Sequence, residues 1–153
     1  MTAMRHLGSW ALALFLIFMF LQATIHPLPN PPEGSVKLFD PAGQNIVFAT
    51  LAAKTQIALF EPTGRVLVAL AELLAAFLLL LPFTRRLGAF LSFLILAGAV
   101  GLHMMPDLLG REVPLSLSPG AATDGGQLFA LAIAMLAASM LLLVVHPGRR
   151  KSA

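Results

Sequence analysis

A single carboxylate in the middle of an apolar run constrains this chain more than any other feature. The run extends from Thr63 to Leu81, with Glu72 near its centre and leucine, alanine and valine at most other positions. It is long enough for a helix to cross a bilayer, which takes about 20 apolar residues. A carboxylate at that depth must face protein, water or a ligand, or take up a proton. Glu72 is therefore either a structural hydrogen-bonding residue or part of a functional site.

The composition indicates a membrane protein. Of the 153 residues, 58% are hydrophobic and only 11% are charged. Lipid leaves helices and closed barrels as the spanning structures, and continuous apolar runs favour helices. We predict one all-α domain over residues 1–153. The small excess of basic residues gathers at helix ends and does not indicate nucleic-acid binding. The chain has no cysteine, which excludes disulfides and iron–sulfur ligation by its own thiolates.

Four apolar runs predict a four-helix transmembrane bundle. They cover residues 7–25, 63–82, 87–105 and 125–146, approximately. The first run could also be a signal peptide. It is longer than a usual signal core and no small-residue cleavage site follows it, so we expect a retained helix.

A fifth segment, residues 44–60, lies between Pro41 and Pro62 and carries several polar side chains. It is too short and too polar to cross the bilayer. We predict an extra amphipathic helix that lies in the outward-facing membrane interface.

Charge segregation predicts the topology. One set of segments holds basic residues and no acid: Arg5, Arg85, Arg86, Arg149, Arg150 and Lys151. The acidic residues of the opposite side are Glu33, Asp40, Glu61, Asp107, Glu112 and Asp124. The positive-inside rule then places both termini and the turn between the second and third spans in the cytoplasm.

Depth along the predicted helices divides the polar residues into two groups. Six polar residues lie within about a turn of the outer boundary: Gln22, His26, Arg65, His103, Asp124 and Gln127. Glu72 lies alone near the midplane, where a carboxyl group is expected to be neutral. A polar mouth above one acid suits a small ligand with a polar head and an apolar body, such as a quinone. It also suits a simple proton-accessible cavity.

Each candidate also has a structural interpretation. Arg65 is as readily a snorkelling anchor, and Asp124 is first a helix cap. His103 is favoured as a helix-end residue bonded to a neighbouring loop, and His26 as an interfacial residue. Two histidines at similar depth could ligate haem, but no other signal supports haem. The sequence contains no metal-binding motif.

The order of spans and several short motifs carry a family resemblance. These motifs are Pro62-Thr63-Gly64-Arg65, Glu72-Leu73, Thr84-Arg85-Arg86-Leu87-Gly88-Ala89, His103 and Asp124-Gly125-Gly126. The chain resembles the DoxX-like family of small bacterial four-helix membrane proteins over roughly residues 43–145. The resemblance implies a multi-pass protein of the bacterial inner membrane that acts as an accessory partner of a membrane redox enzyme. It carries over Arg65, Glu72 and, more weakly, His103 as candidate site positions.

Two functions stay open. The first is an accessory or ligand-binding subunit of a membrane redox system that binds a quinone-like molecule near Glu72. The alternative is a non-enzymatic scaffold, chaperone or permease for a small solute or protons. Without cysteines, a strong haem pair or a metal set, the chain is not expected to be an autonomous redox enzyme.

Overall fold

The computed structural model describes residues 2–25 and 36–146, which fold into helices joined by loops. The helices are α1 (Thr2–Ile25), α2 (Ile46–Thr55), the 3-10 helix η1 (Ala58–Phe60), α3 (Thr63–Leu80), α4 (Arg85–His103) and α5 (Gln127–Val145). Four of them, α1, α3, α4 and α5, are long and apolar enough to cross a membrane, with η1 extending the apolar stretch of α3. The predicted all-α four-helix transmembrane bundle is confirmed.

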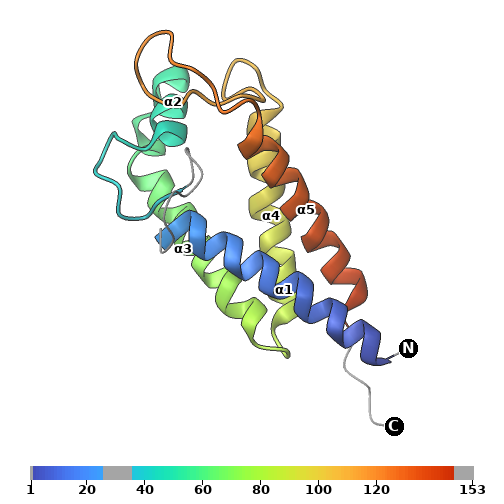
Figure 1. Cartoon of the computed structure of the whole chain (residues 1–153). Coiled ribbons are helices and arrows are strands. Elements are labelled where there is room, and N and C mark those ends of the chain that lie inside the picture. Colours follow the sequence, from blue (N-terminus) through green and yellow to red (C-terminus); the bar gives the residue numbers. More distant parts are fainter. Residues whose placement is uncertain (1, 26–35, 147–153) are drawn as a thin grey trace.

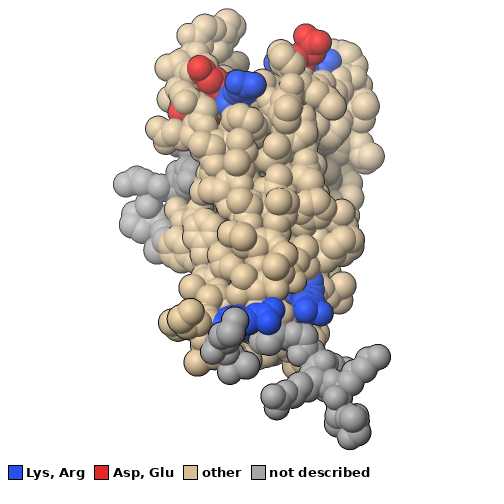
Figure 2. Space-filling model, turned by 90° about the vertical axis from the view of Figure 1, so that its right-hand side faces the viewer, with Lys and Arg blue, Asp and Glu red and all other residues tan. Residues whose placement is uncertain are grey.

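The four long helices form a closed ring. α1 packs against α3 and α5, and α4 packs against the same two helices from the other side (Figure 1). The start of α1, the α3–α4 turn and the end of α5 meet at one end of the bundle, called here the arginine end. The opposite loop end holds α2, η1 and the connection of residues 104–126 (Figure 1). Figure 2 shows an uncharged belt between these two ends, as a bilayer requires.

The arginine half of the bundle is closely packed. Its core consists of Ala13, Leu16, Phe20, Ala75, Ala76, Leu79, Ala89, Leu96, Met135, Ala138 and Leu142. Small residues let the helix backbones approach one another. The closest approach is at Gly88 on α4, where an added Cβ would lie 2.7 Å from the backbone nitrogen of Leu79. This position in the first turn of α4 therefore has room only for glycine.

The loop half is arranged differently because α1 leans across α3 (Figure 1). The last turn of α1 reaches the middle of α3, where the Thr24 hydroxyl is hydrogen-bonded to Glu72. The prediction that Glu72 is the only polar residue at its depth is therefore wrong. α2 and the residues before it occupy the loop end beside α3 (Figure 1).

The segment predicted as one helix over 44–60 is divided into α2 and η1. Asn45 caps α2 by accepting from the backbone N–H of Phe48. Gln56 ends the helix in the left-handed region, with φ 60°. With 10 residues, α2 is shorter than the roughly 20 needed to span a bilayer, so it does not cross. Its apolar face packs on the 104–126 connection in a second cluster formed by Val47, Phe48, Leu51, Leu109 and Val113.

Candidate functional site

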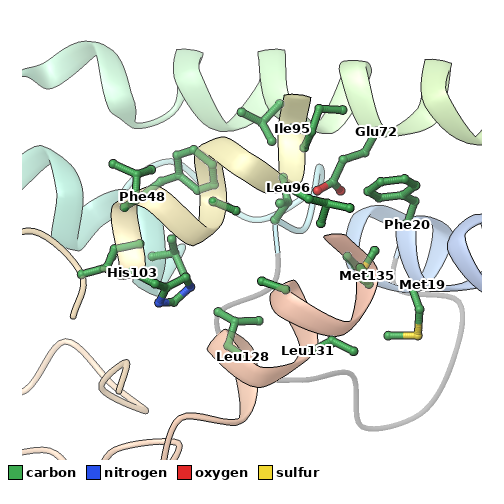
Figure 3. A pocket seen from close by; sticks show the side chains of 18 of the residues that line it. Met19, Phe20, Phe48, Glu72, Ile95, Leu96, His103, Leu128, Leu131 and Met135 are labelled. Carbon is green, nitrogen blue, oxygen red and sulfur yellow. The ribbon is translucent and has the colours of Figure 1, made fainter. Parts of the chain in front are cut away.

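A cavity of about 250 Å³ lies within the loop half of the bundle. Residues of all four long helices, α2 and η1 line it (Figure 3). Among the described residues, the lining is apolar except for three side chains, which are Gln22, Glu72 and His103. Mostly apolar walls with a few polar groups are typical of small-molecule sites. All three polar residues are among the positions that the sequence analysis singled out.

Glu72 lies at the deep end of the cavity and is only 6% exposed. The hydroxyl of Thr24, itself fully buried, donates a 2.7 Å hydrogen bond to its Oε2. Within the described residues, Oε1 of Glu72 has no hydrogen-bond partner, and this atom is not fully buried. In Figure 3 the carboxyl group points into the cavity. One oxygen is therefore fixed by α1, and the other is available to a ligand or water.

His103 lies towards the loop end of the cavity, at the last position of α4. Its Nδ1 is 2.9 Å from the backbone oxygen of Gly110, which can only accept. Nδ1 therefore carries a proton, and in the neutral ring Nε2 is an acceptor. The ring also lies against Phe129, with 5.7 Å between centroids. The predicted bond to a neighbouring loop is confirmed, and His103 also lines the cavity.

The two ionisable lining groups are far apart along the bundle. At a rise of 1.5 Å per residue, Glu72 on α3 lies about 12 Å from the α3–α4 turn, measured along the helix axis. His103 on α4 lies about 27 Å from the same turn. The difference, roughly 15 Å, exceeds the length of a single aromatic or quinone ring. A ring-sized ligand can therefore contact one of these groups, and only an elongated molecule can contact both.

Arg65 does not line the cavity. Its side chain is 2% exposed and its Nε donates to both carboxylate oxygens of Glu61, at 3.0 and 2.9 Å. Its terminal nitrogens donate to the backbone oxygens of Lys37, Leu38 and Asp40, at 2.6, 2.9 and 2.9 Å. The guanidinium therefore ties this loop to the first turn of α3, and its donors are used for structure.

Asp124 is also outside the cavity lining. The N-cap of α5 is Gly126, two residues after Asp124, so the predicted cap position is not confirmed, although the Asp124 side chain bonds to the first turn of the helix. Its carboxylate accepts backbone N–H groups of Val113, Gly126 and Leu128, each at 2.9 Å. Burial acts to raise the pKa of Asp124, but these three donors and the nearby His103 outweigh it and hold the pKa below its usual range. The helix itself starts later, at Gln127, because Gly125 and Gly126 have positive φ values.

The remaining candidates have different outcomes. His26 lies outside the described residues, and with it any test of the two-histidine haem site. Gln22 lines the cavity from α1, near the level of Glu72 rather than at the mouth, since α1 leans across α3. Within residues 2–25 and 36–146, no three histidine or acidic side chains come together in a way that could hold a metal ion.

Thr24 is the site residue that sequence reasoning missed. Threonine is common in membrane helices and breaks no apolar pattern. The available signal was its position two residues after Gln22 in the last turn of the first run. Only the tilt of α1 brings that turn to Glu72, and the apolar pattern of the sequence does not reveal the tilt.

Comparison with known protein families, curated proteins and solved structures finds no match for this chain. The resemblance to the DoxX-like family gains no support from these comparisons and stays a proposal based on sequence motifs. The candidate site is therefore interpreted from its own geometry.

Proposed function

We propose that the protein is a membrane-embedded ligand-binding protein. Its cavity would hold a small molecule with an apolar body and a polar group that hydrogen-bonds to Oε1 of Glu72. The observation that carries this proposal is the buried carboxyl group with one fixed oxygen and one open oxygen, at the deep end of an otherwise apolar cavity. Because such a group is costly in a membrane, a functional role is the default interpretation.

The packing of the arginine half favours binding over transport. Beyond Glu72, the residues Leu16, Ala76, Leu79 and Leu142 belong to one close-packed apolar core. A transported solute or proton would need a polar path through this core. The cavity reaches only the core residues nearest the loop half, which are Phe20, Leu96 and Met135. The alternative of a permease therefore has less support in this conformation.

A quinone or quinol is the ligand class that fits best. Its ring is apolar on both faces, and its oxygens lie at the edge, where one can meet Glu72. A quinol hydroxyl can donate to Oε1, and a protonated Glu72 can donate to a quinone carbonyl. A cavity of about 250 Å³ is slightly smaller than the range of about 300–1,000 Å³ for drug-sized ligands, as suits a ring with its tail elsewhere.

This ligand would make the chain an accessory subunit of a membrane redox system. The sequence has no cysteine, so electrons would be supplied or accepted by a partner enzyme. We place the protein in the inner membrane of a bacterium, with the arginine end in the cytoplasm. The positive-inside rule and the DoxX-like motifs support this placement.

The test is a titration of the purified protein in detergent with a short-chain ubiquinone analogue, in both redox states. At a tenfold excess over Kd, a ligand that binds only the folded protein stabilises it by about 1.4 kcal/mol. Wild type and Glu112→Leu, a matched change of an exposed acid on the 104–126 connection, should both be stabilised. Glu72→Leu should fold and lose the stabilisation.

Two results would contradict the proposal. One is equal stabilisation of Glu72→Leu and wild type, which would leave Glu72 as a structural hydrogen-bonding residue. The other is a proton or solute flux into vesicles that Glu72→Gln abolishes, which would favour the permease.

A further inference from the structure

A buried guanidinium at the arginine end lacks a full set of partners. Arg85, the first residue of α4, is 2% exposed. Its Nε donates to the backbone oxygen of Leu79 at 2.9 Å, and one terminal nitrogen donates to the Ser9 hydroxyl at 3.3 Å. Its carbon Cζ lies 3.7 Å above the centre of the Trp10 ring. The other terminal nitrogen is the one buried side-chain nitrogen or oxygen in the described residues without a hydrogen bond.

Two exposed arginines lie beside this group. Arg5 of α1 donates to the backbone oxygen of Val144 at 3.3 Å. Arg86 of α4 donates to the backbone oxygen of His146 at 3.2 Å. Both guanidiniums thus meet the last turn of α5, and Figure 2 shows basic groups at this edge of the uncharged belt. A guanidinium has five N–H donors, so most donors of Arg5 and Arg86 have no hydrogen-bond partner among the described residues.

The chain supplies no carboxylate side chain to balance these charges. Residues 1–32, 73–106 and 125–153, which contain every segment of this end, include no aspartate or glutamate. His146 does not compensate either. Burial, together with Arg85 and Arg86, lowers its pKa, so the ring stays neutral with Nδ1 2.8 Å from the Ser9 hydroxyl and Nε2 3.1 Å from the Pro82 oxygen. In the part of the chain that the structure describes, three guanidiniums therefore gather at this end without an acidic side chain as partner.

We propose that the arginine end is a binding site for the phosphate of an anionic phospholipid. Arg5 and Arg86 donate to the phosphate oxygens. The buried charge of Arg85, which has no acidic partner among the described residues, adds to the attraction.

The position of the site favours a lipid over a free ion. Basic groups lie at the edge of the uncharged belt in Figure 2, and basic residues near a membrane surface are attracted by anionic lipids. Trp10 stands beside them, 37% exposed, as is typical of tryptophan at a membrane interface. A lipid held there would have its phosphate on the arginines and its chains beside Trp10. This inference is independent of the ligand proposed for the cavity.

Trp10 provides a direct measurement, because the chain has one tryptophan and no tyrosine. The full chain is placed in phosphatidylcholine bilayers with a small fraction of phosphatidylglycerol. Bromine atoms near the headgroup are carried in one sample by the phosphatidylglycerol and in another by an equal amount of the phosphatidylcholine. Brominated phosphatidylglycerol should quench Trp10 fluorescence more strongly.

Charge variants assign the preference to the arginines. An arginine near an anionic surface contributes about fivefold in affinity, so Arg5→Gln and Arg86→Gln should each lower the preference by roughly that factor. Arg111→Gln is the matched control, because Arg111 lies at the loop end, over Phe129. Arg86→Lys, which keeps the charge, should retain most of the preference. Unchanged helix content and thermal stability in pure phosphatidylcholine confirm that each variant is folded.

Three outcomes would overturn the proposal. Equal quenching by the two brominated lipids would show no selective site. An unchanged preference in both glutamine variants would remove the arginines as its cause. Loss of the preference on adding inorganic phosphate, but not chloride at the same ionic strength, would show a site for the free ion rather than for a lipid.

Discussion

The hydrogen bond between Thr24 and Glu72 should stabilise the bundle measurably, because it joins α1 to the middle of α3 inside the membrane. Interhelical hydrogen bonds in membrane proteins average about 0.6 kcal/mol and reach about 1.7 kcal/mol. This bond is short, at 2.7 Å, and the Thr24 side chain is fully buried. We therefore expect it near the upper value. Thr24→Val, which keeps the shape and removes the hydroxyl, should lower the free energy of unfolding by about 1–2 kcal/mol.

A double-mutant cycle separates this bond from packing. Thr24→Val, Glu72→Leu and the double variant are compared with wild type by reversible unfolding in detergent. Because Thr24→Val in the Glu72→Leu background removes no hydrogen bond, it should cost well under 1 kcal/mol. Ser92→Ala is a suitable control, since Ser92 is equally buried but bonds only to Gly88 of its own helix. A coupling energy near zero between positions 24 and 72 would refute the reasoning.

The remaining predictions concern packing, the start of α5 and topology. Gly88→Val should prevent folding or destabilise the bundle severely, because the added Cβ would lie 2.7 Å from the Leu79 nitrogen. Gly98→Ala should leave thermal stability unchanged, because the added carbon meets open space. Asp124 has a lowered pKa, so its contribution to stability should be complete above its unfolded value of about 3.9 and be lost as the pH falls through the lower folded value. Asp124→Asn should remove this loss of stability at acid pH. Identical acid unfolding curves for Asp124→Asn and wild type would contradict the prediction. A reporter fused to the C-terminus should be active only in its cytoplasmic form, and periplasmic activity would reverse the proposed orientation.

The sequence was most informative about features that depend on composition and length. The four spans follow from apolar runs between charged or proline-rich ends. Depth along those spans predicts Gln22, Glu72 and His103 as candidates, and all three line the cavity. The break at Gln56 was not predictable, because a left-handed residue other than glycine leaves no clear pattern.

Interactions between distant segments could not be obtained in the same way. Arg65 donates hydrogen bonds to backbone oxygens of a loop, and backbone groups carry no sequence signal. The cluster of Ser9, Arg85 and His146 joins three helices whose relative rotation the sequence does not define.

Native mass spectrometry of the gently solubilised protein can show whether the cavity holds a ligand. Ala132→Phe would fill the cavity from α5 without changing Glu72, and Ala134→Phe adds the same ring on an exposed face of that helix. We predict that wild type and Ala134→Phe retain a bound small molecule with the mass of a quinone, and that Ala132→Phe loses it. Ligand-free wild type from a membrane rich in quinone, or equal retention by Ala132→Phe, would contradict the account.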